Sequence, residues 1–440
     1  MKKIVVKFGG SSLANAEQFR KAAAIMKENT ARRYVVPSAP GKRFPEDSKV
    51  TDLLYQCYAS AEEGKDFEKE LEEIKKRYQE IIEGLQLPLS IDQEFYEIKQ
   101  QFENHAGRDY AASRGEYLNG ILMAEYLGFP FIDAAQVIRF DSNGVFLPEE
   151  TDRIFHERLK QEQYAVIPGF YGADEQGVVH TFSRGGSDIT GSITAKAAQA
   201  DLYENWTDVS GFLVADPRVI PDPQVISMIT YKELRELSYM GAGVLHEDAI
   251  FPVRKAGIPI NIRNTNAPKD KGTMIVANTC MPSPFTITGI AGRKGFASIN
   301  IEKDMMNTEI GFGRKVLGVF QDHGISFEHV PSGIDTMTVF VKEEEFSGKE
   351  LLVIEQLYQK TEADSIEVEK GLGLIAVVGR SMREQRGTAG RIFSALAHAH
   401  VNVKMIDQGS SELNIIIGVD NGEFETAVKA LYDIFVTIQL

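Results

Sequence analysis

Two glycine-rich segments carry the residue types that could bind phosphate. The first, residues 7–12, reads Lys-Phe-Gly-Gly-Ser-Ser and follows a β-branched run at residues 4–6. Glycines let the backbone approach an anion, and a helix that starts after such a loop offers free N–H groups. Lys7 would add a cation for the phosphate. Since no Gly-Lys-Ser/Thr sequence closes the loop, it is not a Walker loop, and a tight turn with an exposed lysine is the alternative interpretation.

The second glycine-rich segment, residues 183–190, reads Ser-Arg-Gly-Gly-Ser-Asp-Ile-Thr and also opens a predicted helix. It offers Arg184, Asp188 and free backbone amides together. A carboxylate near a helix start is also favoured simply as a cap, and this is the alternative for Asp188. Two such loops, each between a strand and a helix, suit a ligand that carries phosphate and a second anionic group.

The elements that must position these loops have the pattern of an α/β fold. Strands are predicted over residues 4–8, 34–36, 131–133, 164–170, 201–206 and 258–262, and helices dominate residues 52–127. Between the first two strands, apolar residues recur at helical spacing, at Phe19, Ala22, Ala23 and Met26. The order strand, loop, helix, strand indicates a parallel sheet.

The last third of the chain contains an internal repeat. After a predicted linker at residues 278–284, residues 313–327 align with 389–403, and residues 339–341 align with 415–417, at one offset of 76 residues. Each copy reads strand, helix, strand, strand, helix, strand, which is the ferredoxin-like unit. The open face or edge of such a unit must meet a partner. A dimerisation module is one interpretation, and we favour small-molecule sensing at the paired sheets.

Composition excludes several classes of function. The chain has 440 residues, a length typical of about three domains, and a net charge of −15. A negative field disfavours general binding to nucleic acid or to anionic membranes. Two cysteines cannot build a disulfide scaffold or a cysteine-based metal site. Neither a signal peptide nor an apolar run of about 18 residues occurs, so we expect a cytoplasmic protein.

Together the motifs resemble those of the aspartokinases. Besides residues 7–12, the resemblance rests on the order and spacing of the motifs at residues 113–116, 168–172, 181–188, 205–209 and 216–218. The C-terminal repeat looks like the tandem ACT domains of that family, so the resemblance covers essentially the whole chain. Residues 37–43 and 328–335 look most like the monofunctional, lysine-regulated class of Gram-positive bacteria.

The resemblance implies a fold and an activity. The fold would be the three-layer αβα sandwich of amino acid kinases with a mostly parallel sheet at residues 1–280, followed by ACT domains at 288–370 and 371–440. The activity would be ATP-dependent phosphorylation of the aspartate side chain to 4-phospho-L-aspartate, the first step of lysine, threonine and methionine biosynthesis. A carboxylate nucleophile is ionised at neutral pH and needs no general base, so cations and amides that overcome anion repulsion should dominate the site.

The resemblance also assigns roles to residues. Lys7, Arg184 and Asp188 would be catalytic, with Lys7 on the transferring phosphoryl group, Arg184 on a carboxylate of aspartate and Asp188 orienting Lys7 and the substrate amine. The substrate positions, besides Arg184, would be Ser38, Thr51, Phe170 and Glu116, which holds the substrate ammonium. The cofactor-binding positions would be Lys7, Gly9, Gly10, Ser11, Thr207, Asp208 and Arg218. Mg²⁺ is expected to come with ATP, bound mainly through phosphates.

Regulation is expected at the first ACT domain. The effector would bind near Met306, Glu309, Gly313, Glu328 and Ser332. Lysine is the expected effector, because Glu309 and Glu328 could bind its ammonium groups, although each could also be a solvated surface carboxylate. Threonine stays an alternative effector. ACT units usually pair edge to edge, so a homodimer or a dimer of dimers is expected.

Two positions depart from the family pattern: Gly243 stands where a lysine is frequent, and Leu213 where an aromatic residue is frequent. His246 is interpreted as a packed or capping residue, since the chemistry needs no base. Two other functions stay open. One is a kinase of the same fold that acts on another carboxylate or a carbamate, and the other is a non-catalytic amino-acid sensor.

Overall fold

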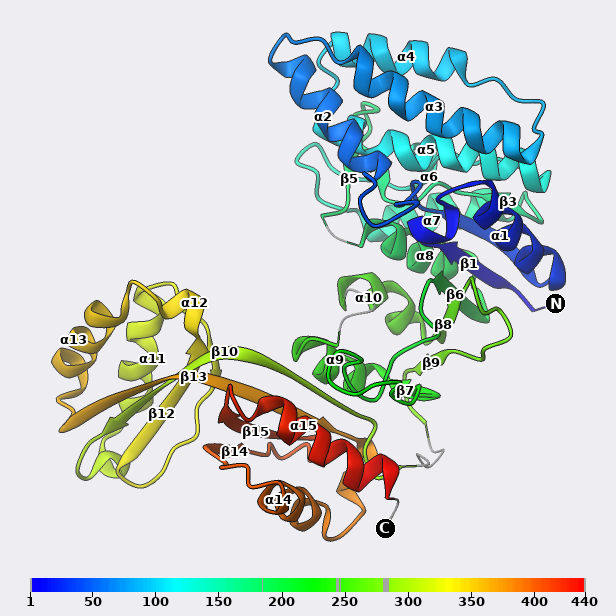
Figure 1. The fold of residues 1–440 in the computed structure, drawn as a ribbon. Coiled ribbons are helices and arrows are strands. Elements are labelled where there is room, and N and C mark those ends of the chain that lie inside the picture. The colour runs from blue at the N-terminus through cyan, green and yellow to red at the C-terminus, as the bar shows by residue number, and fades with distance from the viewer. Residues whose placement is uncertain (1, 184, 243–244, 246, 280–284, 439–440) are drawn as a thin grey trace. The chain divides into compact units, whose positions relative to one another are not determined.

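The computed structural model describes residues 2–183, 185–242, 245, 247–279 and 285–438 (Figure 1). The chain divides into two compact units that interleave along the sequence. The N-terminal unit comprises Met1–Phe212, Val225–Tyr231 and Val244–Cys280, and the C-terminal unit comprises Leu213–Gln224, Lys232–Gly243 and Met281–Leu440. The chain therefore passes between the units more than once. The predicted linker at residues 278–284 lies mostly outside the described residues.

A seven-stranded sheet is the centre of the N-terminal unit. Its strand order is β3 (Ala165–Val166), β2 (Arg32–Pro37), β1 (Ile4–Phe8), β6 (Leu202–Thr207), β8 (Ile260–Asn264), β9 (Thr273–Val276) and β7 (Met228–Thr230). Within the described part of this sheet, only the β8–β9 pair is antiparallel. The predicted strand at residues 131–133 forms no more than an isolated bridge from Phe131 to Val166. A two-stranded hairpin, β4 (Tyr171–Ala173) and β5 (Val179–Thr181), stands apart from this sheet.

Helices cover both faces of this sheet (Figure 1). On one side lie α1 (Ala16–Glu28) and α5 (Arg108–Leu127), with α2 (Val50–Glu62), α3 (Glu68–Leu85) and α4 (Asp92–Glu103) packed outside them. The other side carries α8 (Gly186–Ala197), which contacts β1, β2 and β6, with α7 (Pro148–Leu159) and α10 (Glu247–Ala256) against it. The short helix α6 (Ala134–Val137) precedes α7. Apolar side chains from β1, α1, α2, α3 and α5 form one buried core. The prediction of a three-layer α/β fold is confirmed.

The C-terminal unit contains a six-stranded antiparallel sheet. Its order is β11 (Phe327–His329), β12 (Thr336–Lys342), β10 (Gly289–Glu302), β13 (Ser365–Val378), β15 (Asn414–Asp420) and β14 (Met405–Asp407). The helices of this unit are α11 (Phe312–Asp322), α12 (Glu343–Phe346), α13 (Glu350–Thr361), α14 (Thr388–His398) and α15 (Phe424–Tyr432), together with most of α9 (Tyr231–Tyr239).

Both repeats share the long strands β10 and β13. The first repeat uses residues 296–302 of β10, which pair with β12, and the second repeat uses residues 372–378 of β13, which pair with β15. The remaining half of β10, residues 289–294, pairs with the same half of β13. The predicted final strand of the second repeat is therefore wrong, because after α15 the described chain ends in a π-helical turn, Asp433–Thr437. The N-terminal half of β10 occupies its place.

The predicted repeat offset holds for only part of each copy. Helices α11 and α14 begin at Phe312 and Thr388, as the offset of 76 residues requires. Strands β12 and β15 begin at Thr336 and Asn414, two residues later than the offset gives, because the connection after α14 is longer. A shift of two residues keeps the same side chains on the buried face of a strand, so the apolar pattern also fits the wrong register. No described helix is long and apolar enough to cross a membrane.

Candidate active site

The first glycine-rich loop begins where β1 ends. Lys7 lies on β1, beside Asn205 of the neighbouring strand β6, and is 8% exposed. The backbone N–H of Gly9 donates to the Trp206 carbonyl (2.9 Å), and a short 3-10 helix, Gly10–Leu13, follows. Gly10 is needed for packing, since a Cβ atom there would lie 2.9 Å from the Ala39 carbonyl oxygen. The predicted phosphate loop thus sits at the carboxyl edge of the sheet, where ligands of open α/β folds bind.

Lys7 is held by a carboxylate from the second loop. Its Nζ atom lies 2.6 Å from Asp188 Oδ1 and 3.4 Å from Asn205 Oδ1. The Asn205 side chain in turn donates to Asp188 Oδ1 (2.8 Å). The structure therefore brings Lys7 and Asp188 together from segments far apart in the sequence. Asn205 belongs to this cluster too, from the adjacent parallel strand; it opens the motif at residues 205–209 but was not among the predicted site residues.

The second glycine-rich loop leads into α8. Gly185 has a positive φ of 58°, and Asp188 stands in the first turn of the helix. Arg184 lies outside the described residues, so its predicted position is untested. Phe170 packs against the start of α8: its N–H donates to Thr190 Oγ1 (3.0 Å), and its φ of 81° is unusual for a bulky residue. Such backbone strain often accompanies functional sites.

Glu116 is a buried carboxylate in the same region. It lies on α5, is 6% exposed, and its Oε1 accepts a hydrogen bond from Ser187 Oγ (3.4 Å). Its Oε2 atom is buried without a hydrogen-bond partner among the described residues. Burial raises the pKa of Glu116 to about 7, against the opposing effect of a backbone N–H bond from Ala39. A buried carboxylate with a free oxygen is suited to a ligand cation.

Ser38 and Thr51 flank the segment that follows β2. The Ser38 N–H donates to the Phe8 carbonyl (3.0 Å), and the Ser38 carbonyl accepts from Asn119 Nδ2 (2.6 Å). Thr51 is half-buried in the first turn of α2. Asn119, one turn after Glu116 on α5, is fully buried and was not among the predicted site residues. Its polarity on a helix face that, apart from Glu116, is small and apolar is the only signal in the sequence.

The predicted nucleotide positions fall into both units. Thr207 ends β6, and its hydroxyl donates to Asp208 Oδ1 (3.2 Å) in the N-terminal unit. Arg218 belongs to the C-terminal unit, is exposed, and forms an ion pair with Asp216 (2.5 Å). Leu213 belongs to the C-terminal unit as well, while Gly243 and His246 lie outside the described residues.

The predicted effector residues surround β11 and the start of α11. Met306 is buried, with 7% of it exposed. A Cβ atom on Gly313 would lie 3.5 Å from the Cε atom of Met337, so this glycine packs against that side chain. Glu309 forms ion pairs with Lys303 and Lys315, both at 2.6 Å, and these hydrogen bonds lower its pKa. Ser332 is exposed, and its backbone forms an isolated antiparallel β-bridge with Met337. Glu309 is therefore already paired with two lysines of its own chain.

Glu328 is not a solvated carboxylate. Its side chain is 3% exposed, and its Oε2 accepts a hydrogen bond from the Tyr239 hydroxyl (2.6 Å) of α9. Lys342 forms an ion pair with its Oε1 at 3.6 Å, a distance too long for a hydrogen bond, and that atom has no hydrogen-bond partner among the described residues. Of the two acidic candidates, Glu328 is the one with a carboxylate oxygen that accepts no hydrogen bond from the described residues.

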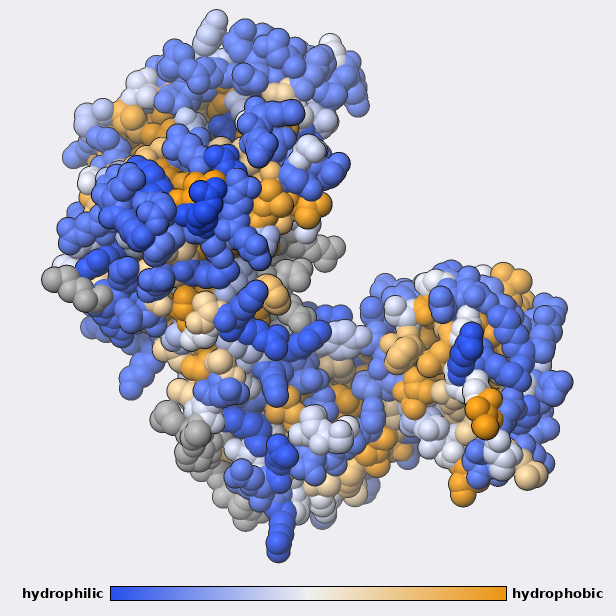
Figure 2. All heavy atoms as spheres, turned by 180° about the vertical axis from the view of Figure 1, so that it is seen from behind, coloured by the Kyte–Doolittle hydropathy of each residue, from blue (hydrophilic) through white to orange (hydrophobic). Residues whose placement is uncertain are grey.

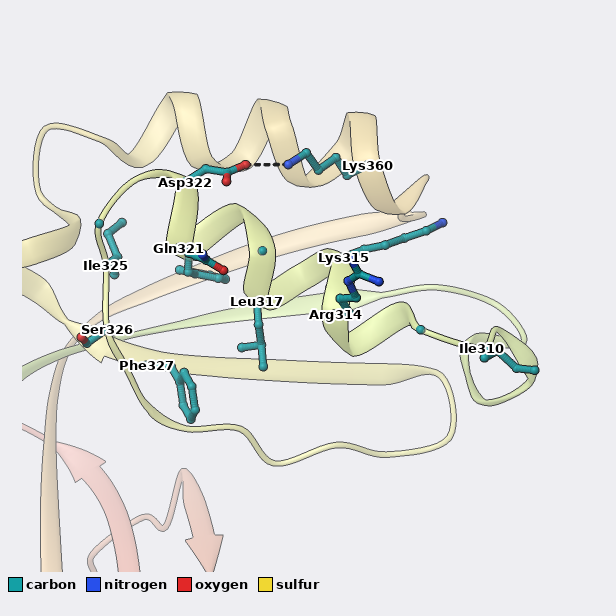
Figure 3. A pocket seen from close by; sticks show the side chains of 14 residues that line it. Ile310, Arg314, Lys315, Leu317, Gln321, Asp322, Ile325, Ser326, Phe327 and Lys360 are labelled. Carbon is teal, nitrogen blue, oxygen red and sulfur yellow. Dashed lines mark hydrogen bonds and ion pairs between the residues drawn. The ribbon is translucent and has the colours of Figure 1, made fainter.

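A broad hollow of about 1180 Å³ runs along α11 and β11 of the first repeat (Figure 3). The side chains of Arg314, Leu317 and Phe327 line it, and Asp322 pairs with Lys360 at its margin. None of the predicted effector residues lines this hollow. Apolar surface gathers on the first repeat (Figure 2), where the exposed large hydrophobic residues include Ile310, Phe327, Ile334, Leu351 and Leu352.

Comparison with known proteins decides the family. The model of the amino acid kinase family matches residues 2–264, and an ACT domain model matches residues 375–435. Aspartokinase 3 of Bacillus subtilis (strain 168) is 42% identical over 450 residues, which cover 98% of either chain. The chain belongs to the aspartokinase family. This confirms the resemblance found in the motifs.

Solved structures of aspartokinases have the same fold. The crystal structure of Clostridium acetobutylicum aspartate kinase superposes with a TM-score of 0.91 at 50% identity, covering 99% of this chain and all of that one. E. coli aspartokinase III in complex with aspartate and ADP superposes with a TM-score of 0.73 at 26% identity, covering 98% of this chain and 99% of that one. The expected aspartokinase architecture, a kinase fold followed by ACT units, is confirmed.

Proposed function

We propose that this aspartokinase transfers the γ-phosphoryl group of ATP to the side-chain carboxylate of L-aspartate, giving 4-phospho-L-aspartate. The observation that carries the proposal is the buried Lys7, held by Asp188 and Asn205 where the two glycine-rich segments meet. The names of the relatives support it, as does the E. coli structure described with aspartate and ADP. This reaction is the first step of lysine, threonine and methionine biosynthesis.

Phosphoryl transfer between two anions needs positioning and charge neutralisation more than proton transfer. In our proposal Lys7 binds the transferring phosphoryl group, and Asp188 keeps its ammonium group in place. Backbone and hydroxyl donors of Gly9, Gly10 and Ser11 would bind the phosphates. The aspartate carboxylate attacks in its ionised form, so no side chain has to remove a proton.

The proposed aspartate site lies around Glu116. Its unpaired Oε2 atom would accept a hydrogen bond from the substrate ammonium, which restores the interaction that burial removes. Arg184 would bind a substrate carboxylate through both arms of its guanidinium group, a role assigned from its motif. Ser38, Thr51 and the strained backbone of Phe170 would complete the site.

The nucleotide-binding residues are assigned from the sequence motifs, and the metal from the usual chemistry of ATP. Thr207, Asp208 and Arg218 are proposed on the nucleotide side. Among the described residues, no three acidic, histidine or cysteine side chains gather as a metal site. We propose that Mg²⁺ enters with ATP and is bound mainly by phosphate oxygens and water, as is usual for this ion. We also propose a cytoplasmic location and a kinase domain at residues 1–280, followed by ACT domains at 288–370 and 371–440.

For regulation, we propose that lysine binds the first ACT repeat and lowers activity, with Met306, Glu309, Gly313, Glu328 and Ser332 as its surroundings. A structure of E. coli aspartokinase III is described in complex with lysine and aspartate as a T-state, which supports this choice over threonine. Glu328 is the residue whose free oxygen fits an ammonium group. Pairing of two chains through these repeats, as a dimer or a dimer of dimers, would cover the exposed apolar residues of the first repeat.

The test is a coupled assay of ADP release, with hydroxylamine trapping of the acyl phosphate. We expect aspartate to be used with a kcat/KM at least about tenfold above that of glutamate, since one methylene group changes the fit by that order. Turnover of another carboxylate or a carbamate without aspartate would favour a different kinase of this fold. Binding of an amino acid without any ADP release would favour a sensor.

A further inference from the structure

Arg77 is a buried cation that the proposed chemistry does not use. It lies on α3 and is only 3% exposed. Its two terminal nitrogens donate to main-chain carbonyls, one to Ser48 (2.5 Å) and the other to Gly41 (2.6 Å). Asp47 Oδ2 lies 3.5 Å from the same guanidinium group. Arg77 therefore ties together both ends of residues 41–48, which we call the clamp segment.

The clamp segment touches the phosphate loop directly. The Gly41 N–H donates to the Gly10 carbonyl (2.9 Å), and a Cβ atom on Gly41 would lie 2.6 Å from the Gly10 carbonyl carbon. The two backbones are therefore in van der Waals contact, with no side chain between them. Because Arg77 donates to the carbonyl of Gly41, it fixes the peptide that meets Gly10.

The chain on either side of the clamp segment carries the proposed aspartate site. Just before it, the Ser38 carbonyl accepts from Asn119 Nδ2, and the backbone N–H of Ala39 acts to lower the pKa of Glu116. Just after it, α2 begins at Val50, whose N–H donates to the Pro40 carbonyl (3.4 Å), and Thr51 follows. A displaced clamp segment would therefore move Ser38 and Thr51 together.

We infer that Arg77 is a positioning residue of the aspartate site, which closes the clamp segment so that Ser38 and Thr51 face Glu116. This inference rests on the proposed function. The planar guanidinium group can donate to two carbonyls at a fixed separation, whereas a lysine ammonium in its place would satisfy one of them. A positioning error of about 1 Å is enough to lower the rate of a transfer reaction by about a hundredfold.

Besides the contact of Gly10 with Gly41, the nucleotide side is fixed by contacts outside the clamp segment. The Gly9 N–H bonds to Trp206 of β6, and the Ser12 hydroxyl bonds to Thr265 Oγ1 (2.8 Å), both independent of Arg77. Loss of Arg77 should therefore disturb aspartate binding much more than ATP binding. This split between the two substrates separates a positioning role from a general loss of folded protein.

The experiment measures KM for aspartate, KM for ATP and kcat of the full-length protein with Arg77→Lys and Arg77→Met. We expect KM for aspartate to rise about tenfold or more in Arg77→Met and less in Arg77→Lys, with KM for ATP changed by less than about twofold. Arg43→Met is the matched control. The Arg43 guanidinium group bonds to the side chains of Asp47 and Glu80, and it donates to no described carbonyl of the clamp segment. Its constants should stay within about twofold of wild type.

A second readout does not depend on activity. Lys42 and Arg43 are exposed, so trypsin can cut the clamp segment once it opens. Cleavage there should be faster in both Arg77 variants than in wild type, at temperatures where circular dichroism reports a folded protein. Unchanged KM for aspartate and unchanged cleavage in Arg77→Lys would overturn the inference. If the wild-type protein does not use aspartate but cleavage is still faster in the Arg77 variants, the proposed function is refuted. The role of Arg77 in closing the clamp segment is then still supported.

Discussion

The residues of the candidate site form one connected set of charges and polar atoms. Lys7 and Asp188 make a short ion pair, and Asn205 bonds to the carboxylate from the neighbouring strand. Asp188 leaves the ammonium group of Lys7 with donor capacity for a further anion, since an ammonium group has three N–H donors. Glu116, nearby on α5, contributes the complementary acceptor.

Replacing Lys7 with methionine should abolish most of the transfer reaction. Loss of one electrostatic contact to developing charge lowers kcat by about a hundredfold or more. Stopped assays of ADP release measure this, and a melting curve controls for folding. The variant leaves Asp188 with Asn205 as a partner, so the fold should persist. Turnover within a few-fold of wild type would remove Lys7 from the phosphoryl site.

Glu116 predicts a pH dependence of aspartate binding. Its pKa of about 7 means that the empty site is largely protonated at pH 6. The substrate ammonium needs the carboxylate form, so KM for aspartate should fall as the pH rises from 6 to 8, while KM for ATP stays nearly constant. In Glu116→Gln the KM for aspartate should be raised and this slope should vanish. A wild-type KM that is flat over this range would contradict the assignment.

The same pKa also predicts how the stability of the substrate-free protein depends on pH. Because the folded pKa lies above the usual value of 4.5, the empty protein loses stability as the pH rises from about 4.5 through 7. A neutral glutamine does not incur this loss. Without substrate, Glu116→Gln should therefore melt at a higher temperature than wild type at pH 8 and at nearly the same temperature at pH 5. A lower melting temperature at pH 8 would show that the carboxylate stabilises the fold.

At the scale of elements, the proposed effector strand β11 is tied to other parts of the C-terminal unit. Tyr239 of α9 bonds to Glu328 of β11, and the His329 ring is hydrogen-bonded to Asp407 of β14 (2.7 Å). At the other end of α9, the fully buried Glu233 pairs with Arg380 (2.9 Å). Strand β11 thus holds contacts to both α9 and the second repeat.

Variants of Glu328 and Tyr239 separate the charge of Glu328 from its hydrogen bond. Glu328→Gln keeps the size and the Tyr239 bond but removes the charge that would bind a lysine ammonium, so lysine inhibition should be lost while basal turnover persists. Glu328→Ala should relieve inhibition in the same way. Tyr239→Phe keeps the charge and should remain inhibited. The measurement is activity against lysine concentration, and identical curves for wild type and Glu328→Gln would remove this residue from the effector site.

At the scale of the whole molecule, the C-terminal unit includes two segments that come earlier in the sequence. The Val214 carbonyl accepts from the Ile290 N–H (2.7 Å), and the Gln224 N–H donates to the Tyr432 hydroxyl (3.0 Å). Glu233, in the second segment, also bonds to Thr288 (2.5 Å). These contacts make the C-terminal unit depend on residues 213–224 and 232–242.

Truncation at residue 284 should therefore destabilise the kinase part as well as remove regulation. The fragment loses two partners of the buried Glu233 carboxylate, Thr288 and Arg380, and removing such partners from a buried charge is costly. We expect a melting temperature several degrees below that of the full chain, since a loss of about 1 kcal/mol alone shifts a domain of this size by about 2–4 °C. Calorimetry of both forms tests this. A fragment as stable as the full chain would show that the two segments hold their structure alone.

The sequence alone determined the chemistry that the site can perform, the α/β class and the repeated C-terminal module. Lys7, Asp188 and the glycines beside them are local signals, because a loop between a strand and a helix needs those residue types in that order. Helices α11 and α14 likewise follow from apolar spacing, and their offset is correct. Such features depend on neighbours within a few positions of the chain.

Only the tertiary structure decided which distant residues meet. The contact of Asn205 with Asp188, the two carbonyls bound by Arg77 and the burial of Glu328 depend on strand order and helix packing, which no local pattern encodes. The sharing of β10 between the repeats, and the two-residue shift between β12 and β15, were hidden because side chains alternate along a strand with a period of two. An even shift or a longer strand leaves that alternation unchanged, so backbone pairing alone reveals it.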